Sequence, residues 1–486
     1  MKNIYQKISS LVLGATILLS ACDTDLDINR DPDLLNPESV PMSAELPATE
    51  TGIAAAAGAY YGLIGGFWSQ YWTQSAIANQ YKYIDQYALN SQESINNAGW
   101  AAMYDALLDA RNIKKIAEAE NNWNYYLIAT TLEVYASQIM TDLYGDIPYS
   151  EANNSSILNP KFETQEEVYD MMTTDLKTAL DKDFSESSVD NAPGATDFLF
   201  AGDMSKWKQF ANTLLLKVYL RQTEVRPSIA QAGVEELLTA GTTFLSTHAA
   251  ITQYLDEDSR SNPLYETDRR QLNVGTNLRA STTLGSYLDA NVDPRLEFIY
   301  DGTEYQNQGD FDNGSSTASV VILSATAPYY FISLAESKFL QAEAEARYGS
   351  AANAEAAYAA GVSAAFAQFD TADSTVDGST LLAGNYAYPS GTLAENIEAI
   401  ITQKWVSLFP GNGFEAFIEN NRTGYPRVST VGQDAATYVP GEFTLAIEAV
   451  TTVFPKRIPL PQDETQRNSN APVSKAITDA VWYDAN

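Results

Sequence analysis

Apolar side chains recur at steps of three and four residues along much of the chain after about Gly52, and this spacing constrains the fold more than any other feature. Side chains spaced in this way share one face of a helix. Over residues 100–119 the face consists of Trp100, Met103, Tyr104, Leu107, Ala110, Ile113 and Ala117. Over residues 204–222 it consists of Trp207, Phe210, Ala211, Leu214 and Val218, with Lys206, Lys208, Asn212 and Lys217 facing away. The sequence therefore predicts an all-α (mainly α) fold.

Residues 332–369 show the clearest pairing of two helices. Gly349 ends the first helical segment, and a second follows at once. In the second segment Ala354, Tyr358 and Gly361 give the small, aromatic, small spacing of a tetratricopeptide repeat, in which small residues let neighbouring helices approach closely. The first segment fits that consensus poorly, so a coincidental helix pair is the alternative. We predict a tetratricopeptide-like helical repeat scaffold.

A long stretch between about residues 256 and 328 departs from helical spacing. It is rich in Asn, Gly, Asp and Ser. Long irregular segments inside compact domains often carry function. We therefore predict a loop-rich insertion here.

The N-terminus has the pattern of a secretion signal. Lys2 and Lys7 precede an apolar run from Leu11 to Leu19, and small residues lead to Cys22. The run is too short to cross a bilayer core of about 30 Å as a helix. Its Leu-Ser-Ala-Cys sequence resembles the bacterial lipobox, which implies that residues 1–21 are a lipoprotein signal peptide and that Cys22 is lipidated. The alternative is an ordinary signal peptide with a chance Cys at its end.

Residues 22–50 have the composition of an acidic, Pro-containing tether. Their alternating acids resemble a calcium loop, but the sixth and twelfth positions counted from Asp23 are Ile28 and Leu34 instead of Gly and Glu. The prolines at 32, 37, 41 and 47 are expected to prevent a helix. The sequence therefore predicts one domain over residues 51–486.

Composition removes several classes of function. Acidic residues outnumber basic ones by 62 to 29, and a formal charge of -33 repels the phosphates of nucleic acid. One Cys and one His, His248, exclude a multi-histidine or thiolate metal site, so we expect no cofactor. Paired carboxylates for glycoside hydrolysis stay open, because only their separation in space defines them.

Several segments, taken in order, resemble one family. They are MTDLYGDIPYSEA at 140–152, FAGDMSKWKQFANTLLLKVYLR at 200–221, NVDPRL at 291–296, ESKFLQAEAEARYG at 336–349, QKWVSLFPGNGFEAFIENNRTGYPRV at 403–428 and FPKRIPLPQDETQRNSN at 454–470. Together, behind a lipobox, they resemble the SusD-like (SusD/RagB) outer-membrane nutrient-binding lipoproteins. The resemblance spans nearly all of the chain after Cys22.

The resemblance implies a cell-surface lipoprotein of the outer membrane, anchored at Cys22, that has no enzymatic activity. Such a protein binds a nutrient and delivers it to a SusC-like TonB-dependent transporter. The ligand is usually an oligosaccharide or polysaccharide, though some relatives take peptides. Ligand-binding positions vary within the family, so the resemblance carries over the fold and not the binding residues.

Binding residues can instead be sought from the chemistry of sugars, which need a flat ring to stack on and polar groups beside it. The segment 67–87 is the densest in both. Its candidate residues are Trp68, Tyr71, Trp72, Gln74, Asn79, Tyr81, Tyr83 and Asp85. Trp68 and Trp72 also fall on one helical face with Tyr61 and Ile64, so packing in the core is the alternative for both. A second group of candidates in the irregular segment comprises Tyr265, Arg270, Tyr287 and Tyr305.

Three functions are compatible with these features. The first is a surface glycan-binding subunit of a nutrient importer, which we favour. The second is a lipid-anchored helical scaffold that binds a peptide or protein partner. The third is a surface glycoside hydrolase, which would need two carboxylates facing each other across a cleft.

Overall fold

The computed structural model describes residues 40–186, 192–371 and 374–484. Contacts divide the chain after Pro41, and residues 42–486 form one unit. The predicted signal peptide, Cys22 and the predicted tether up to residue 39 lie outside the described residues.

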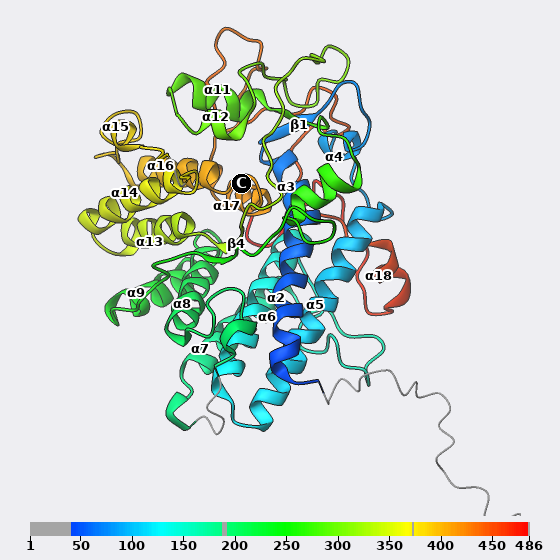
Figure 1. Ribbon diagram of the computed structural model, residues 1–486, viewed down its shortest axis with the longest axis vertical. Helices are drawn as coiled ribbons and strands as arrows, with labels where there is room; N and C mark the ends of the chain where they lie inside the picture. Colours follow the sequence, from blue (N-terminus) through cyan, green and yellow to red (C-terminus); the bar gives the residue numbers. More distant parts are fainter. Residues whose placement is uncertain (1–39, 187–191, 372–373, 485–486) are drawn as a thin grey trace, which may run out of the picture. The chain divides into compact units, whose positions relative to one another are not determined.

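The body is mainly helical (Figure 1), so the predicted fold class is confirmed. The longer helices are α2 (Met42–Ala55), α3 (Gly62–Trp68), α5 (Ser94–Ala119), α6 (Trp123–Tyr144), α7 (Gln165–Leu180), α8 (Met204–Leu220), α9 (Pro227–Thr239), α11 (Thr282–Ala290), α13 (Leu334–Tyr348), α14 (Ala351–Ala367), α16 (Leu393–Ser407) and α17 (Gly413–Thr423). The short ones are α4 (Lys82–Asp85), α10 (Pro263–Tyr265), α12 (Leu296–Ile299), α15 (Ser379–Leu382), α18 (Gln462–Arg467), the 3-10 turns η3 (Phe184–Glu186) and η4 (Gly194–Thr196), and the π-helical turns η2 (Ala56–Tyr61) and η5 (Glu266–Gln271). The strands are β1 (Trp72–Gln74), β2 (Ala249–Ile251), β3 (Leu278–Ala280) and β4 (Tyr329–Ile332).

Helix α2 begins at Met42, so the predicted domain start at residue 51 is wrong, as is the expectation that Pro47 prevents a helix. Pro47 lacks the N–H that would bond one turn back. The helix forms because packing on a neighbour supplies most of the stability of a helix in a protein. Leu46 and Ile53 are fully buried, and α2 packs along α5.

The central helices confirm the predicted apolar faces. Helix α2 packs on α5, α5 on α6, and α6 on α7 and α8. In α5 the predicted face is buried except for the half-buried Tyr104, and in α8 it is buried throughout. The buried apolar side chains of these helices belong to one continuous hydrophobic core.

The predicted helix pair over residues 332–369 is α13 and α14, which pack closely on each other. Ala354, Tyr358 and Gly361 are all buried. A Cβ atom at Gly361 would lie 2.7 Å from the ring of Phe339 on α13. Glycine at this position therefore permits the close helix contact that the repeat-like spacing predicts.

The segment 256–328 is less irregular than predicted, because it contains α10, η5, β3, α11 and α12. Strand β3 pairs antiparallel with β1, placing Ala280 opposite Trp72. Strand β2 pairs antiparallel with β4. The insertion is thus tied to the segment at 72–74 by main-chain pairing. Such pairing has no sequence signal beyond short apolar runs.

Lys217 does not face away from the core, contrary to the prediction, but lies buried in a network of ion pairs. Its Nζ atom is 2.9 Å from Glu336 Oε1 and 3.0 Å from Glu415 Oε2. The neighbouring Arg221 is 3.1 Å from Asp142 Oδ2 and 2.8 Å from Glu415 Oε2. The network joins α6, α8, α13 and α17.

Helix α16 adds a further cation to this network. Lys404 Nζ is 2.9 Å from Glu415 Oε1 and 3.2 Å from Glu419 Oε1. Burial alone would raise the pKa of Glu415, but Arg221, Lys217 and Lys404 outweigh it and hold the pKa at about 2. Buried charges are tolerated when they are paired in this way.

None of the helices in the described residues is both long and apolar enough to cross a membrane.

Candidate functional site

Most of the predicted stacking platform at 67–87 lies in the core. Trp68, Tyr71 and Trp72 are at most 2% exposed. The ring of Trp72 meets Phe67 and Phe409 edge to face, with centroids 6.2 and 6.3 Å apart. A ring enclosed on all sides has no face open to a ligand. The prediction that these three rings form a binding platform is therefore wrong in this structure. The packing alternative made for Trp68 and Trp72 describes both residues, and Tyr71 is buried with them.

The predicted polar partners Gln74 and Asp85 are fully buried as well. Asp85 Oδ2 accepts hydrogen bonds from Thr73 Oγ1 at 2.7 Å and from the Gln74 N–H at 2.8 Å, and Gln308 Nε2 donates to the other oxygen. Burial raises the pKa of Asp85 to about 6 despite these donors. Gln74 Oε1 accepts from the Tyr81 N–H at 2.7 Å. Both side chains join segments of the core and do not face a ligand.

The remaining residues of the two predicted groups do not converge on one site. Tyr81 is buried, Tyr83 half-buried and Asn79 exposed. Tyr287 stacks on Tyr386 with ring centroids 5.9 Å apart. Tyr305 packs against Tyr300 and Gly285.

A pocket of about 560 Å³ opens instead where the second predicted group begins. Its volume lies within the range of pockets that hold small molecules. Its wall combines aromatic, small apolar and polar side chains. The lining residues are Thr51, Ala55, Ala59, Tyr60, Phe198, Ile251, Gln253, Tyr254, Ser259, Arg260, Ser261, Pro263, Glu266, Thr267 and Gln271.

Four separate parts of the chain position this lining. The end of α2 and the π-helical turn η2 supply one wall, and the π-helical turn ends with Tyr60 and Tyr61. Phe198 follows η4, and Tyr254 follows β2. The fourth part runs from Ser259 to Gln271. Within it, Asn262 Oδ1 accepts from the N–H of Leu264 at 3.0 Å and so caps α10. Pro263 suits the first turn of that helix, which has no partner for an N–H.

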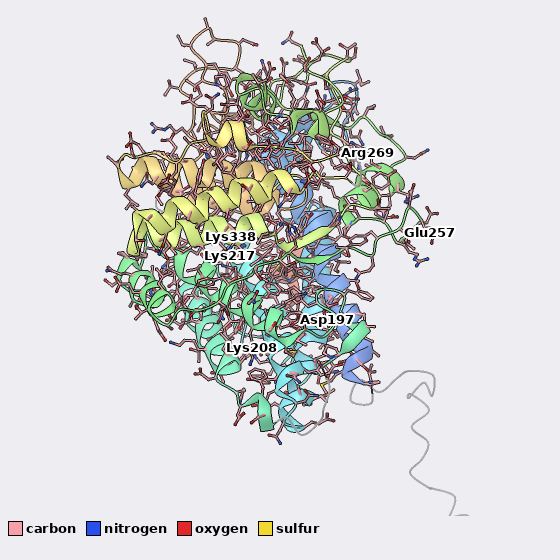
Figure 2. The ribbon with its side chains drawn as sticks, turned by 60° about the vertical axis from the view of Figure 1, so that its left-hand side comes forward. Asp197, Lys208, Lys217, Glu257, Arg269 and Lys338 are labelled. Atoms are coloured by element: carbon pink, nitrogen blue, oxygen red, sulfur yellow. The ribbon has the colours of Figure 1, made fainter. Side chains whose placement is uncertain are left out.

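Two arginines and four carboxylates pair at the rim of the pocket. Arg270 bonds to Asp256 and lies 3.2 Å from Glu266 Oε2 and 3.4 Å from Asp258 Oδ1. Arg260, which lines the pocket, pairs with Glu257 at 2.6 Å. Figure 2 shows Glu257 at the outer edge of the segment 256–260, and Asp197 beside α2. Among the residues that line the pocket, Arg260 and Glu266 are the charged ones, and their formal charges balance.

The structure brings two predicted residues, Tyr265 and Arg270, to this pocket's edge. The Arg270 guanidinium lies 5.5 Å from the centre of the Tyr265 ring. Neither side chain is among those that line the pocket. Tyr60, Phe198 and Tyr254 are not among the residues predicted from the sequence. These aromatic residues are far apart in the chain and carry no shared local pattern.

Within the described residues, His, Cys, Asp and Glu side chains form no group of three or more that could hold a metal ion.

Comparison with known proteins decides the family. The profile of the SusD-like family, described as "Starch-binding associating with outer membrane", matches residues 44–444. The chain belongs to the SusD-like family. The landmark segments named from sequence at 140–152, 200–221, 291–296 and 403–428 all fall inside that match.

Solved structures of SusD-like proteins share the fold. A SusD/RagB family protein of Bacteroides thetaiotaomicron matches with a TM-score of 0.76 and 22% identity, over 92% of this chain and 99% of its own. A chitin-binding protein matches at 0.71 and 24%, over 93% and 100%. A chitin-binding SusD homolog of Flavobacterium johnsoniae matches at 0.71 and 22%, over 91% and 99%. No curated protein matches this chain in sequence.

Proposed function

We propose that this SusD-like protein binds a nutrient oligosaccharide or polysaccharide in the pocket between α2, β2 and the segment 259–271. The observation that carries the proposal is the lining, which combines aromatic side chains with polar groups on a SusD-like scaffold. Relatives with the same fold are described as chitin-binding, and the family as starch-binding. Glycan binding is the function that agrees with the lining of the pocket, with these relatives and with the family's description.

The lining suits the two chemistries of a sugar ring. Tyr60, Phe198 and Tyr254 can cover the C–H face of a ring, as aromatic side chains do in ligand sites. The amides of Gln253 and Gln271 can bond to hydroxyl groups, because each amide both donates and accepts. We expect the ligand to be neutral, since a protein of charge -33 repels polyanions.

The lining gives little support to a hydrolase. Canonical glycoside hydrolases act with two carboxyl groups flanking the scissile bond. Glu266 is the one carboxylate among the lining residues, and it already accepts from Ser261 Oγ and pairs with Arg270. We therefore propose a binding protein without enzymatic activity. Incubation with starch and chitin fragments should release no new reducing ends.

Replacing Tyr254 by Ala should weaken oligosaccharide binding several-fold. The loss of one aromatic contact removes about 0.5–1.5 kcal/mol beyond the buried area. The measurement is calorimetric titration of a panel of starch and chitin oligosaccharides into the protein lacking residues 1–22. Tyr348→Ala is the control, because Tyr348 is also half-buried but ends α13, outside the pocket. Equal affinity of both variants and wild type for every ligand that binds would refute this site.

The proposed cellular setting is the outer surface of the outer membrane. We propose that Cys22 carries the lipid and that the bound glycan passes to a SusC-like TonB-dependent transporter. Support comes from the lipobox-like sequence that ends at Cys22 and from the outer-membrane association in the family's description. A protein-binding scaffold would instead leave the glycan panel blank while still recovering a membrane partner in pull-down.

Cys22→Ser should release the protein from membranes, because the thiol is the proposed point of acylation. Labelling cells with an acyl-chain probe and fractionating them measures the change. Wild type should take up the label and sediment with membranes, and the variant should do neither. A Cys22→Ser protein that is labelled and still sediments with membranes would contradict the anchor.

A further inference from the structure

Two buried carboxyl groups lie behind the pocket wall. Glu50 is fully buried on α2, next in sequence to the lining residue Thr51. Asp197 is 3% exposed and precedes the lining residue Phe198. The pair therefore connects two of the separate chain segments that form the pocket.

Asp197 accepts four hydrogen bonds. The backbone N–H groups of Leu199, Phe200 and Gly202 donate to it at 2.9, 3.0 and 2.8 Å. The indole Nε1 of Trp207 donates at 2.7 Å. Both carboxyl oxygens of Asp197 therefore act as acceptors.

The two carboxyl oxygens of Glu50 have different surroundings. Its Oε2 atom accepts from the N–H of Phe198 at 2.8 Å. Among the described residues no donor bonds to its buried Oε1 atom, and the side chain with which Glu50 can share a hydrogen bond is that of Asp197. The titratable groups that face it are Asp197, from the segment before α8, and Tyr125, from α6. Neither can supply a positive charge.

Burial, and then the charge of Asp197, raise the pKa of Glu50 to about 10. The group is therefore neutral at physiological pH and carries a proton on a buried oxygen. Neutralisation is the usual response of an acid that is buried without a cation.

We propose that protonated Glu50 is a positioning residue for the pocket, which fixes the Phe198 wall by accepting its backbone N–H while sharing its proton with Asp197. Gln253 Nε2 donates to the Phe198 carbonyl at 3.1 Å from the pocket side. The peptide units on both sides of the Phe198 side chain are thus held. That Phe198 contacts the ligand rests on the proposed function; that Glu50 holds Phe198 does not.

Three variants separate this role from simple packing. Glu50→Gln keeps an acceptor for Phe198 and a donor for Asp197, so it imitates the protonated acid. Glu50→Ala removes both. Glu45→Gln is the matched control on the same helix, because Glu45 bonds to Asn112 Nδ2 at 2.6 Å and is not among the lining residues.

The proton on Glu50 can be detected from the pH dependence of the free energy of unfolding. The folded pKa lies above the unfolded value of about 4.3, so the stabilisation is complete below that value and is lost as pH rises towards 10. We expect the unfolding constant of wild type, divided by that of Glu50→Gln, to rise about tenfold per pH unit between pH 5 and 9. A flat ratio, with both proteins folded, would overturn the proposal.

The positioning role is measured by hydrogen exchange over residues 197–203 and by oligosaccharide affinity. At pH 7 the Gln and control variants should match wild type, whereas Glu50→Ala should lose amide protection and bind several-fold more weakly. If Glu50→Gln loses as much protection as Glu50→Ala, or if neither variant differs from wild type, the assignment is wrong. Should no oligosaccharide bind any protein, the proposed function fails, while the pH ratio and the exchange data still decide the role of Glu50.

Discussion

Replacing Arg221 by Met should cost about 3–5 kcal/mol of the free energy of unfolding, the range measured when one partner of a buried ion pair is removed. Arg221 is fully buried and contacts Asp142, Glu415 and Glu419. Met fills part of the volume but leaves these carboxylates short of a cation. Water cannot solvate them there, because all three are buried. Urea unfolding followed by circular dichroism measures the loss.

Arg427→Met is the matched control for this prediction. Arg427 pairs with Glu398, but its side chain is 58% exposed. An exposed pair contributes about 0–1 kcal/mol because water and salt screen it. The two Arg-to-Met changes should therefore differ by several kcal/mol. Similar urea midpoints for both variants would show that the network around Arg221 does not bear on stability.

The helical fold could be predicted because its signal is local. The apolar faces of α5 and α8 repeat every three or four residues, and such spacing defines a helix face without knowledge of its neighbours. Local spacing does not predict the burial of Lys217. Its position in the helix predicts exposure, but its partners Glu336 and Glu415 come from helices over a hundred residues away. Only the tertiary structure brings them to it.

The site could be predicted only in part, for the same physical reason. A run of aromatic and amide residues such as 67–87 serves equally well as a stacking surface or as a core, since both uses exploit large apolar rings. The pocket draws Tyr60, Phe198 and Tyr254 from distant segments. The stretch that begins at about residue 256, which its composition singled out, contains the lining residues from Ser259 to Gln271, and loops positioned by a rigid scaffold often carry function.

Trp72→Ala should lower the free energy of unfolding by about 3–5 kcal/mol, as truncation of a core Trp does. The ring is fully buried, and it packs so tightly that a Cβ atom at Gly66 would lie 1.9 Å from it. The rings of Phe67, Tyr71 and Phe409 pack edge to face on it, so its removal leaves a cavity among them. Oligosaccharide affinity, measured well below the unfolding transition, should stay at the wild-type value because Trp72 does not line the pocket.

Trp482→Ala provides the comparison, because Trp482 is only half-buried. It packs on Tyr169 with ring centroids 5.5 Å apart, so its truncation should cost less than that of Trp72. The opposite pattern for Trp72→Ala, an unchanged unfolding midpoint with lost binding, would mean that the ring opens to solvent and stacks on the ligand. A lower free energy of unfolding thus indicates that Trp72 is part of the core, and a lower oligosaccharide affinity indicates that it contacts the ligand.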